Sequence, residues 1–115
     1  MPEIKLSGDI ALVGFEILDP AEIIVVKKIV GNALKRMTES GEYKEMKLTL
    51  QQHPHGKSFK HEIEAVAFFS YGRFSTNVIG RNLFTAVSEA CEKIISEMEH
   101  ARKKGQGHDK KTYNR

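Results

Sequence analysis

Residues 43–69, YKEMKLTLQQHPHGKSFKHEIEAVAFF, decide the fold of this chain. Apolar and polar side chains alternate on either side of a central run that is rich in turn-forming residues. The apolar members of the alternation are Met46, Leu48, Leu50, Ile63, Ala65, Ala67 and Phe69. A period of two is typical of strands that bury one face. The segment therefore predicts an antiparallel hairpin, with strands at 43–52 and 59–69 joined by the five-residue connection His53-Pro54-His55-Gly56-Lys57.

Two further strand regions flank this hairpin. After a turn at residues 70–73, the β-branched side chains of Phe74–Ile79 predict a third strand. At the other end of the chain, residues 4–6 and 10–18 are rich in apolar side chains. We interpret them as one strand with a break at Gly8-Asp9.

A first helix is predicted from Asp19-Pro20-Ala21-Glu22 onward. The Asp19 carboxylate can accept hydrogen bonds from the free amides of the first turn, and Pro20 fits the first helical position. The apolar stripe that follows at helical spacing consists of Ile23, Val26, Val30, Ala33, Leu34 and Met37. Ser40-Gly41 predicts the end of this helix.

A second helix is predicted after Gly80-Arg81, with Asn82 as its N-cap. Its apolar stripe consists of Leu83, Val87, Ala90, Cys91, Ile94, Met98 and Ala101. We expect it to run to about Lys104. Residues 105–115 contain no aliphatic side chain, so we interpret them as a disordered basic tail behind a single domain of residues 1–104.

The predicted order is strand, helix, three strands, helix. Two amphipathic helices and a sheet bury their apolar faces together when both helices lie on the same side of the sheet. We therefore expect an α+β two-layer sandwich, β-α-β-β-β-α, with two helices packed on one face of a four-stranded sheet.

Composition narrows the classes of function. The chain has 115 residues, 40% of them hydrophobic, which suits one globular domain. Its single cysteine, Cys91, excludes an internal disulfide and a cysteine-based zinc site. No apolar run approaches the ~20 residues that span a bilayer, and the first residues, MPEIKLSGD, do not look like a secretory signal. We expect a soluble cytoplasmic protein that does not act at a membrane.

The formal charge of +3 is unevenly distributed. Residues 1–100 carry a net charge of −2 and residues 101–115 a net charge of +5. The surplus of positive charge is therefore local, and it marks segments rather than the whole domain as candidates for nucleic-acid binding.

One stretch of the last predicted helix resembles a known family. Asn82-Leu83-Phe84-Thr85-Ala86-Val87, continuing through Glu92-Lys93-Ile94, is similar to the Asp-Met-Tyr-Ala-Ala-Ile and Asp-Lys-Leu of ribosome hibernation-promoting factors and ribosome-associated translation inhibitors. The order of elements over about residues 3–104 also resembles this family in its short form. The resemblance implies a protein that binds 16S-type ribosomal RNA in the decoding channel of the small ribosomal subunit. Such a protein inhibits translation or protects idle ribosomes.

The candidate RNA-binding residues come from both lines of reasoning. The first helix carries four basic residues and no acidic one between Ile23 and Thr38, a pattern that suits phosphate binding. The resemblance implies basic contacts at the last helix. The full set is Lys27, Lys28, Lys35, Arg36, Arg73, Arg81, Lys93, His100, Arg102, Lys103 and Lys104.

Each candidate also has an ordinary structural interpretation. The cations of the first helix can form a solvated face, and Arg102-Lys103-Lys104 can complement the helix dipole. Tyr71-Gly72-Arg73-Phe74 can stack on bases or simply anchor a hairpin. Arg81 can meet a phosphate with the help of the helix dipole. A double-stranded-RNA-binding domain and a protein-interaction module, such as a homodimer, remain as alternative functions.

Enzymatic and metal chemistry are not expected. Zinc needs three or four ligands at fixed geometry, and no cysteine lies close in sequence to His53, His55 and His61 to complete such a site. The chain has neither a nucleophile motif nor a glycine-rich phosphate loop. We therefore predict no catalytic residues, no metal and no cofactor.

Overall fold

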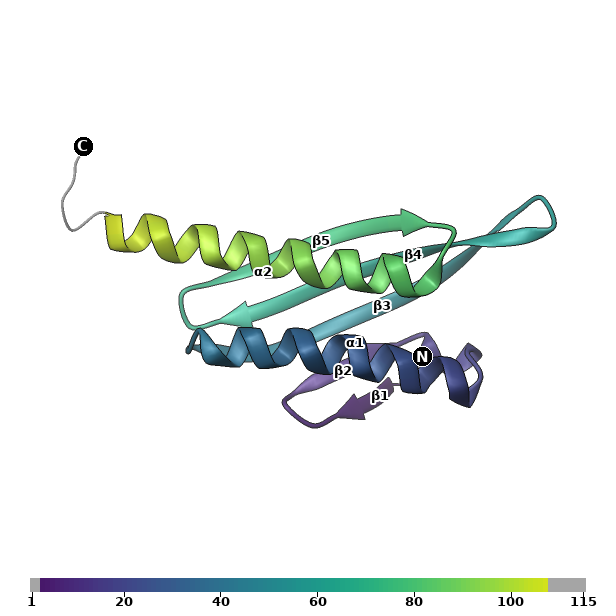
Figure 1. Cartoon of the computed structure of the whole chain (residues 1–115), viewed down its shortest axis with the longest axis horizontal. Helices are drawn as coiled ribbons and strands as arrows, with labels where there is room; N and C mark the ends of the chain where they lie inside the picture. Colours follow the sequence, from purple (N-terminus) through teal and green to yellow (C-terminus); the bar gives the residue numbers. More distant parts are fainter. Residues whose placement is uncertain (1–2, 108–115) are drawn as a thin grey trace.

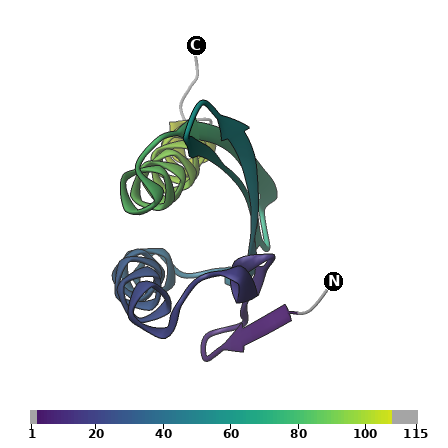
Figure 2. The same ribbon diagram turned by 90° about the vertical axis from the view of Figure 1, so that its right-hand side faces the viewer.

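The structure, a computed structural model, describes the backbone of residues 3–107 and side chains as far as Lys103. Its elements are β1 (Glu3–Leu6), β2 (Ile10–Val13), the 3₁₀ helix η1 (Phe15–Ile17), α1 (Pro20–Glu39), β3 (Tyr43–His55), β4 (Ser58–Phe69), β5 (Gly72–Gly80) and α2 (Leu83–Gly107). The strands form one five-stranded sheet in the order β1-β2-β3-β4-β5. Both helices lie on the same face of this sheet, as Figures 1 and 2 show. The predicted α+β class and the two-helix layer are confirmed.

The predicted number of strands was wrong, because the first strand region forms two strands. Gly8 and Asp9 both have positive φ angles, of 78° and 59°, which reverse the chain between β1 and β2. The two strands pair antiparallel, with Leu6 opposite Ile10. Strand β2 then ends early, because Gly14, with φ 84°, leads into η1 where the sequence predicted a strand to Leu18.

The sheet is mixed. Strand β2 runs parallel to β3, with Ile10 opposite Met46 and Leu12 opposite Leu48, and α1 makes the crossover between them. The β3–β4 and β4–β5 pairs are antiparallel. The β3–β4 hairpin predicted from the alternating pattern is present, and it forms the centre of the sheet.

Both helix starts follow the predicted chemistry. Asp19 accepts a hydrogen bond from the Glu22 amide at 2.8 Å, and the Glu22 side chain accepts one from the Asp19 amide at 3.1 Å, which makes a capping box. The Asn82 side chain accepts from the Thr85 amide at 2.9 Å and caps α2. Helix α1 ends before Gly41, whose φ of 79° breaks the helical path.

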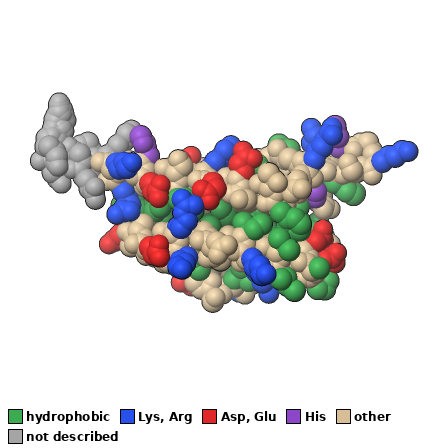
Figure 3. Space-filling model, in the orientation of Figure 1, with side chains coloured by type: hydrophobic (Ala, Val, Ile, Leu, Met, Phe, Trp, Pro, Cys, Tyr) green, Lys and Arg blue, Asp and Glu red, His purple; other side chains and the backbone are tan. Residues whose placement is uncertain are grey.

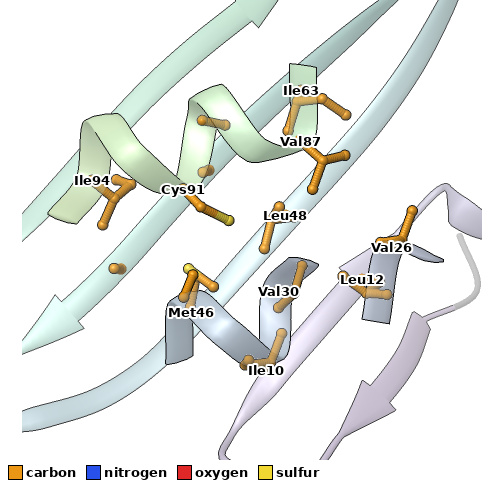
Figure 4. Close-up of a cluster of buried hydrophobic side chains, with 14 of the residues drawn as sticks. Ile10, Leu12, Val26, Val30, Met46, Leu48, Ile63, Val87, Cys91 and Ile94 are labelled. Atoms are coloured by element: carbon orange, nitrogen blue, oxygen red, sulfur yellow. The ribbon is translucent and has the colours of Figure 1, made fainter. Parts of the chain in front are cut away.

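One core lies between the helices and the sheet. Figure 4 shows side chains of α1 and α2 meeting those of β2, β3 and β4. The largest fully buried members are Phe15, Leu12, Met37, Met46, Leu48, Ile63, Ile94, Ile95, Met98, Val26, Val30 and Val87. The apolar stripes predicted for the two helices supply most of the helical members, and Ile95 adds to the predicted stripe of α2.

The central hairpin is longer than predicted and its turn is tighter. Strand β3 continues to His55 and β4 begins at Ser58, so only Gly56 and Lys57 connect them, with Gly56 at φ 64°. The hairpin extends past the rest of the sheet (Figure 1). The molecule measures 54 × 30 × 22 Å with a radius of gyration of 15.8 Å, against about 13 Å for a compact domain of this size.

The end of α2 also lies beyond its predicted position near Lys104, since the helix continues to Gly107. The predicted disordered tail, residues 105–115, falls mainly on residues 108–115, which lie outside the described part of the chain.

Candidate nucleic-acid interface

Three predicted cations of α1 are exposed. Lys28 and Lys35 lie two turns apart on the side opposite the buried stripe of Val26, Val30 and Met37. Lys27 is exposed on one flank of the helix. Because α1 is capped and packed on the sheet, these ammonium groups stand on a rigid element. This arrangement suits the neutralisation of a row of phosphates.

The fourth cation of α1 is engaged by α2. One guanidinium nitrogen of Arg36 donates to both carboxylate oxygens of Glu92, at 2.8 and 3.1 Å. The two residues lie on facing sides of a hollow between the helices, which Ile29 and Cys91 also line. Arg36 therefore faces α2, whereas Lys28 and Lys35 face away from the protein.

Helix α2 carries mixed charge. Lys93 lies 3.6 Å from Glu89, one turn earlier on the same helix. Among its described side chains, the carboxylates are Glu89, Glu92, Glu97 and Glu99 and the cations are Lys93, Arg102 and Lys103. Figure 3 shows basic and acidic side chains interspersed over the helical face of the molecule. The middle of α2 is thus a poor phosphate-binding surface.

The cations at the end of α2 lie near an aromatic cluster. His100 and Lys103 are exposed, and Arg102 is near enough to Tyr71 to favour its ionised form. Burial has the larger effect, so the pKa of Tyr71 is raised overall. The side chain of Lys104, also predicted to bind RNA, lies outside the described residues.

The rings near Tyr71 pack on one another. Phe69 is the centre of the cluster, 5.4 Å from Tyr71, 5.8 Å from Phe74 and 5.7 Å from Tyr43 between ring centroids. Such edge-on and tilted contacts stabilise the β4–β5 turn. These contacts favour the interpretation of Phe69 and Phe74 as hairpin anchors, whereas Tyr71 remains 40% exposed.

Arg73 lies on β5 and is separate from the helical cations. It lines a hollow of about 480 Å³ together with two lysines, Lys5 and Lys47. Three carboxylates line the same hollow: Glu3, Asp9 and Glu45. With equal numbers of both charges, this hollow has no net attraction for an anion.

Arg81 lies just before α2, beside the β3–β4 hairpin. A nitrogen of its guanidinium is 3.4 Å from Nε2 of His55, and its carbonyl oxygen is 3.1 Å from Nδ1 of His61. About 30 Å of helix separates Arg81 from Arg102, at 1.5 Å per residue. The predicted RNA-binding residues therefore fall into separate regions rather than one continuous surface.

The three histidines of the hairpin have different partners. Nε2 of His53 lies 2.7 Å from a carboxylate oxygen of Glu62, which also accepts from Asn77 at 2.8 Å. These two hydrogen bonds lower the pKa of the Glu62 carboxyl. Within residues 3–103, no three His, Cys, Asp or Glu side chains are placed to hold a metal ion.

Sequence reasoning missed the cations of the hairpin itself. Lys57 in the turn and Lys60 on β4 were read only as turn and alternation residues. The alternating pattern continues through residues 53–55, and this continuation indicates that both strands are longer than predicted. In the longer hairpin, His55 lies 3.4 Å from the Arg81 guanidinium, so Arg81 contacts the same segment that carries both lysines.

The fold is similar to a solved structure. The chain resembles the N-terminal domain of Protein Y. The superposition with the Thermus thermophilus domain has a TM-score of 0.53, covers 84% of this chain and 98% of that domain, and relates sequences that are 15% identical. At this identity the likeness concerns the fold. No family model and no curated protein matches the sequence.

Neither α1 nor α2, as far as the structure describes them, is long and apolar enough to cross a bilayer.

Proposed function

We propose that this protein is a non-enzymatic, ribosome-associated factor of the hibernation type, which binds small-subunit ribosomal RNA and inhibits translation or protects idle ribosomes. The observation that carries the proposal is the row of exposed lysines on α1, led by Lys28 and Lys35, in a stretch without acidic residues between Ile23 and Thr38. The fold likeness to Protein Y, a ribosome hibernation factor, supports it. The resemblance of residues 82–87 to that family adds independent support.

The distribution of charge favours one side of the helical layer for RNA binding. Glu92 lies between the helices and engages Arg36, so an RNA backbone laid along the groove would meet a carboxylate. Lys27, Lys28 and Lys35 lie on the part of α1 directed away from α2. We therefore assign the main contact to this part of α1, with Arg102 and Lys103 as a second contact at the end of α2.

The alternative of a double-stranded-RNA-binding domain is less well supported. Such domains usually carry a basic run at the start of their last helix, where this chain has only Arg81 before Leu83. The β1–β2 hairpin and the parallel β2–β3 pairing also add strands before the helix–three strands–helix core that such domains share.

A protein-interaction module is favoured by one observation. Ile17, Ile24 and Val25 are 56%, 57% and 38% exposed around the start of α1. Exposed apolar groups of this size mark interaction surfaces in many proteins. If this surface is the functional one, neutralising the lysines of α1 leaves function intact.

Sedimentation through sucrose tests the proposal. The protein is mixed with purified small subunits or whole ribosomes at low and at high salt, and its share in the particle fractions is measured. We expect co-migration at low salt that is lost at high salt, because phosphate contacts release counterions. The double variant Lys28→Gln, Lys35→Gln is expected to reduce co-migration.

The matched control is Lys44→Gln, Lys47→Gln, which removes the same charge from exposed residues of β3. Equal effects of the two double variants would mean that only total charge matters. Absence of the wild-type protein from the particle fractions at low salt would refute the proposal. Tight binding of a plain RNA duplex without ribosomes would favour the double-stranded-RNA alternative.

A further inference from the structure

The part of the β3–β4 hairpin that projects from the sheet is a feature the proposed function does not use. Strand β2 last pairs with β3 at Thr49, and β5 last pairs with β4 at His61. Beyond these points the two strands pair only with each other, from His53 opposite Lys60 to His55 opposite Ser58. We call residues 53–60 the hairpin arm; it projects roughly 10 Å at about 3.3 Å per residue. Figure 1 shows it extending past both helices.

The arm contributes little to the fold. Its residues are exposed except for Lys60, which is half-buried, and Phe59 is 48% exposed. Isolated two-stranded hairpins are at best marginally stable in water. An exposed phenylalanine at the end of such a ribbon adds no core packing. The arm therefore has surface features that stability alone does not explain.

The two faces of the arm differ in chemistry. Strand alternation places Phe59 and Pro54 on one face and His53, His55 and Lys60 on the other. Arg81 reaches this second face, since its guanidinium lies 3.4 Å from His55. Lys57 occupies the turn at the tip. One face of the ribbon is thus basic and the other aromatic.

The basic face is not neutralised by the protein. None of the ion pairs among residues 3–103 includes Lys57, Lys60 or Arg81. The carboxylate nearest the base of the arm, Glu62, already accepts from His53 and Asn77. An anionic partner would therefore meet three cations without displacing an internal ion pair.

We propose that the hairpin arm is a third RNA contact, which inserts into an unpaired loop of RNA. Phosphates would bind on the face of Lys60 and Arg81 and at Lys57, and an unstacked base would lie on the ring of Phe59. A ribbon free on both faces can contact RNA on two sides at once, which a side chain on the body of the protein cannot. Unpaired RNA fits best, because its bases are free to stack on aromatic rings.

This inference deepens the proposed function, since it names a further contact to the same class of partner. It predicts that three cations at the arm contribute to RNA binding separately from the lysines of α1. In the variant Lys57→Gln, Lys60→Gln, Arg81→Gln, the log–log salt dependence of binding to single-stranded RNA is expected to become shallower by about 2, at ~0.7 per lost phosphate contact. The matched control is Lys5→Gln, Lys44→Gln, Lys47→Gln, which removes the same charge elsewhere on the sheet.

The stacking contact is tested at Phe59. We expect Phe59→Leu to weaken binding about five-fold or more, because it keeps an apolar side chain but removes the aromatic face. Phe59→Tyr is expected to bind like the wild type. Circular dichroism and thermal unfolding of each variant show that the fold is kept, as expected for an exposed position.

The experiment measures binding of the full chain to two probes. The first is a fluorescein-labelled, unstructured twelve-nucleotide RNA, followed by anisotropy between 50 and 300 mM salt. The second is purified small ribosomal subunits, followed by sedimentation. The arm is supported if its triple variant, and not the matched control, binds the oligonucleotide more weakly with a shallower salt slope.

The outcomes separate the two proposals. If oligonucleotide binding depends on the arm and the protein does not bind subunits, the proposal that the arm binds RNA is supported and the ribosomal function is refuted. Subunit and oligonucleotide binding that is unchanged in the arm variants refutes the arm and leaves the ribosomal function standing. No binding of the wild type to either probe refutes both. A duplex of the same length bound as tightly as the single strand refutes the assignment to unpaired bases.

Discussion

The ion pair between Arg36 of α1 and Glu92 of α2 leads to a prediction for both RNA binding and the stability of the fold. In the variant Glu92→Gln, Arg36 loses a carboxylate that it contacts at 2.8 and 3.1 Å. The side chains of Arg36 and Glu92 are 48% and 58% exposed, so solvent screens their attraction. Exposed pairs contribute about 0.2–1 kcal/mol. We therefore expect the free energy of unfolding to fall by less than about 1 kcal/mol, measured by urea denaturation.

The same substitution is expected to strengthen RNA binding. It removes a negative charge from the groove and frees the Arg36 guanidinium, which flanks the lysine face of α1 on the side of α2. One additional phosphate contact steepens the log–log salt dependence by about 0.7–0.9. An exposed charge is worth up to about 1 kcal/mol, which limits the gain in affinity to about five-fold.

Anisotropy or sedimentation across a salt series measures this effect, with Glu97→Gln as the control. Glu97 is an exposed carboxylate farther along α2, and no described ion pair includes it. Equal gains for both variants would show a general charge effect. Weaker binding by Glu92→Gln, with the fold intact, would refute the placement of the RNA beside α1.

Three further predictions concern the fold. Burial raises the pKa of the Cys91 thiol to about 12, so the native protein should react with a thiol reagent at pH 8 about a thousand-fold more slowly than the unfolded chain. The thiol of the unfolded chain ionises from about pH 9, whereas the native thiol ionises only near pH 12. The free energy of unfolding should therefore fall by up to about 4 kcal/mol as the pH rises from 9 to 12, and the variant Cys91→Ala should lack this contribution. Replacing the cap in Asp19→Ala should cost about 0.5–2 kcal/mol in thermal or urea unfolding, and Asp19→Ser should restore most of it; no loss would contradict the capping box. Gly8→Ala should destabilise more than Gly41→Ala, since both have φ near 79° but only a Cβ at Gly8 would clash with Leu34; equal losses would show that backbone strain alone matters.

Local chemistry explains why so much of the fold is predictable. The starts of both helices follow from single side chains, Asp19 and Asn82, that satisfy free amides a few residues away. The buried faces of β3 and β4 follow from a period of two, and those of the helices from a period of 3.6. These effects act over a few residues, so the sequence expresses them directly.

The errors in strand number and hairpin length arose where a backbone conformation or a pairing partner decided where a strand begins or ends. Apolar residues on both sides of Gly8 are compatible with one interrupted strand or with a hairpin, and the positive φ angles of Gly8 and Asp9 select the hairpin. The length of the central hairpin was underestimated because Pro54 and Gly56 suggested a wide turn. In the structure Pro54 lies within β3, opposite Phe59.

By itself, the sequence determined the two helices, the central hairpin, their buried faces and the basic character of α1, because periodicity and capping are local. Only the tertiary structure decided which charges are available. It placed Glu92 against Arg36, whose positions in the chain are far apart, and it placed Arg81 against His55 of the hairpin arm. Electrostatic interactions depend on distance in space, and residues far apart in the chain acquire that distance only when the helices and strands pack.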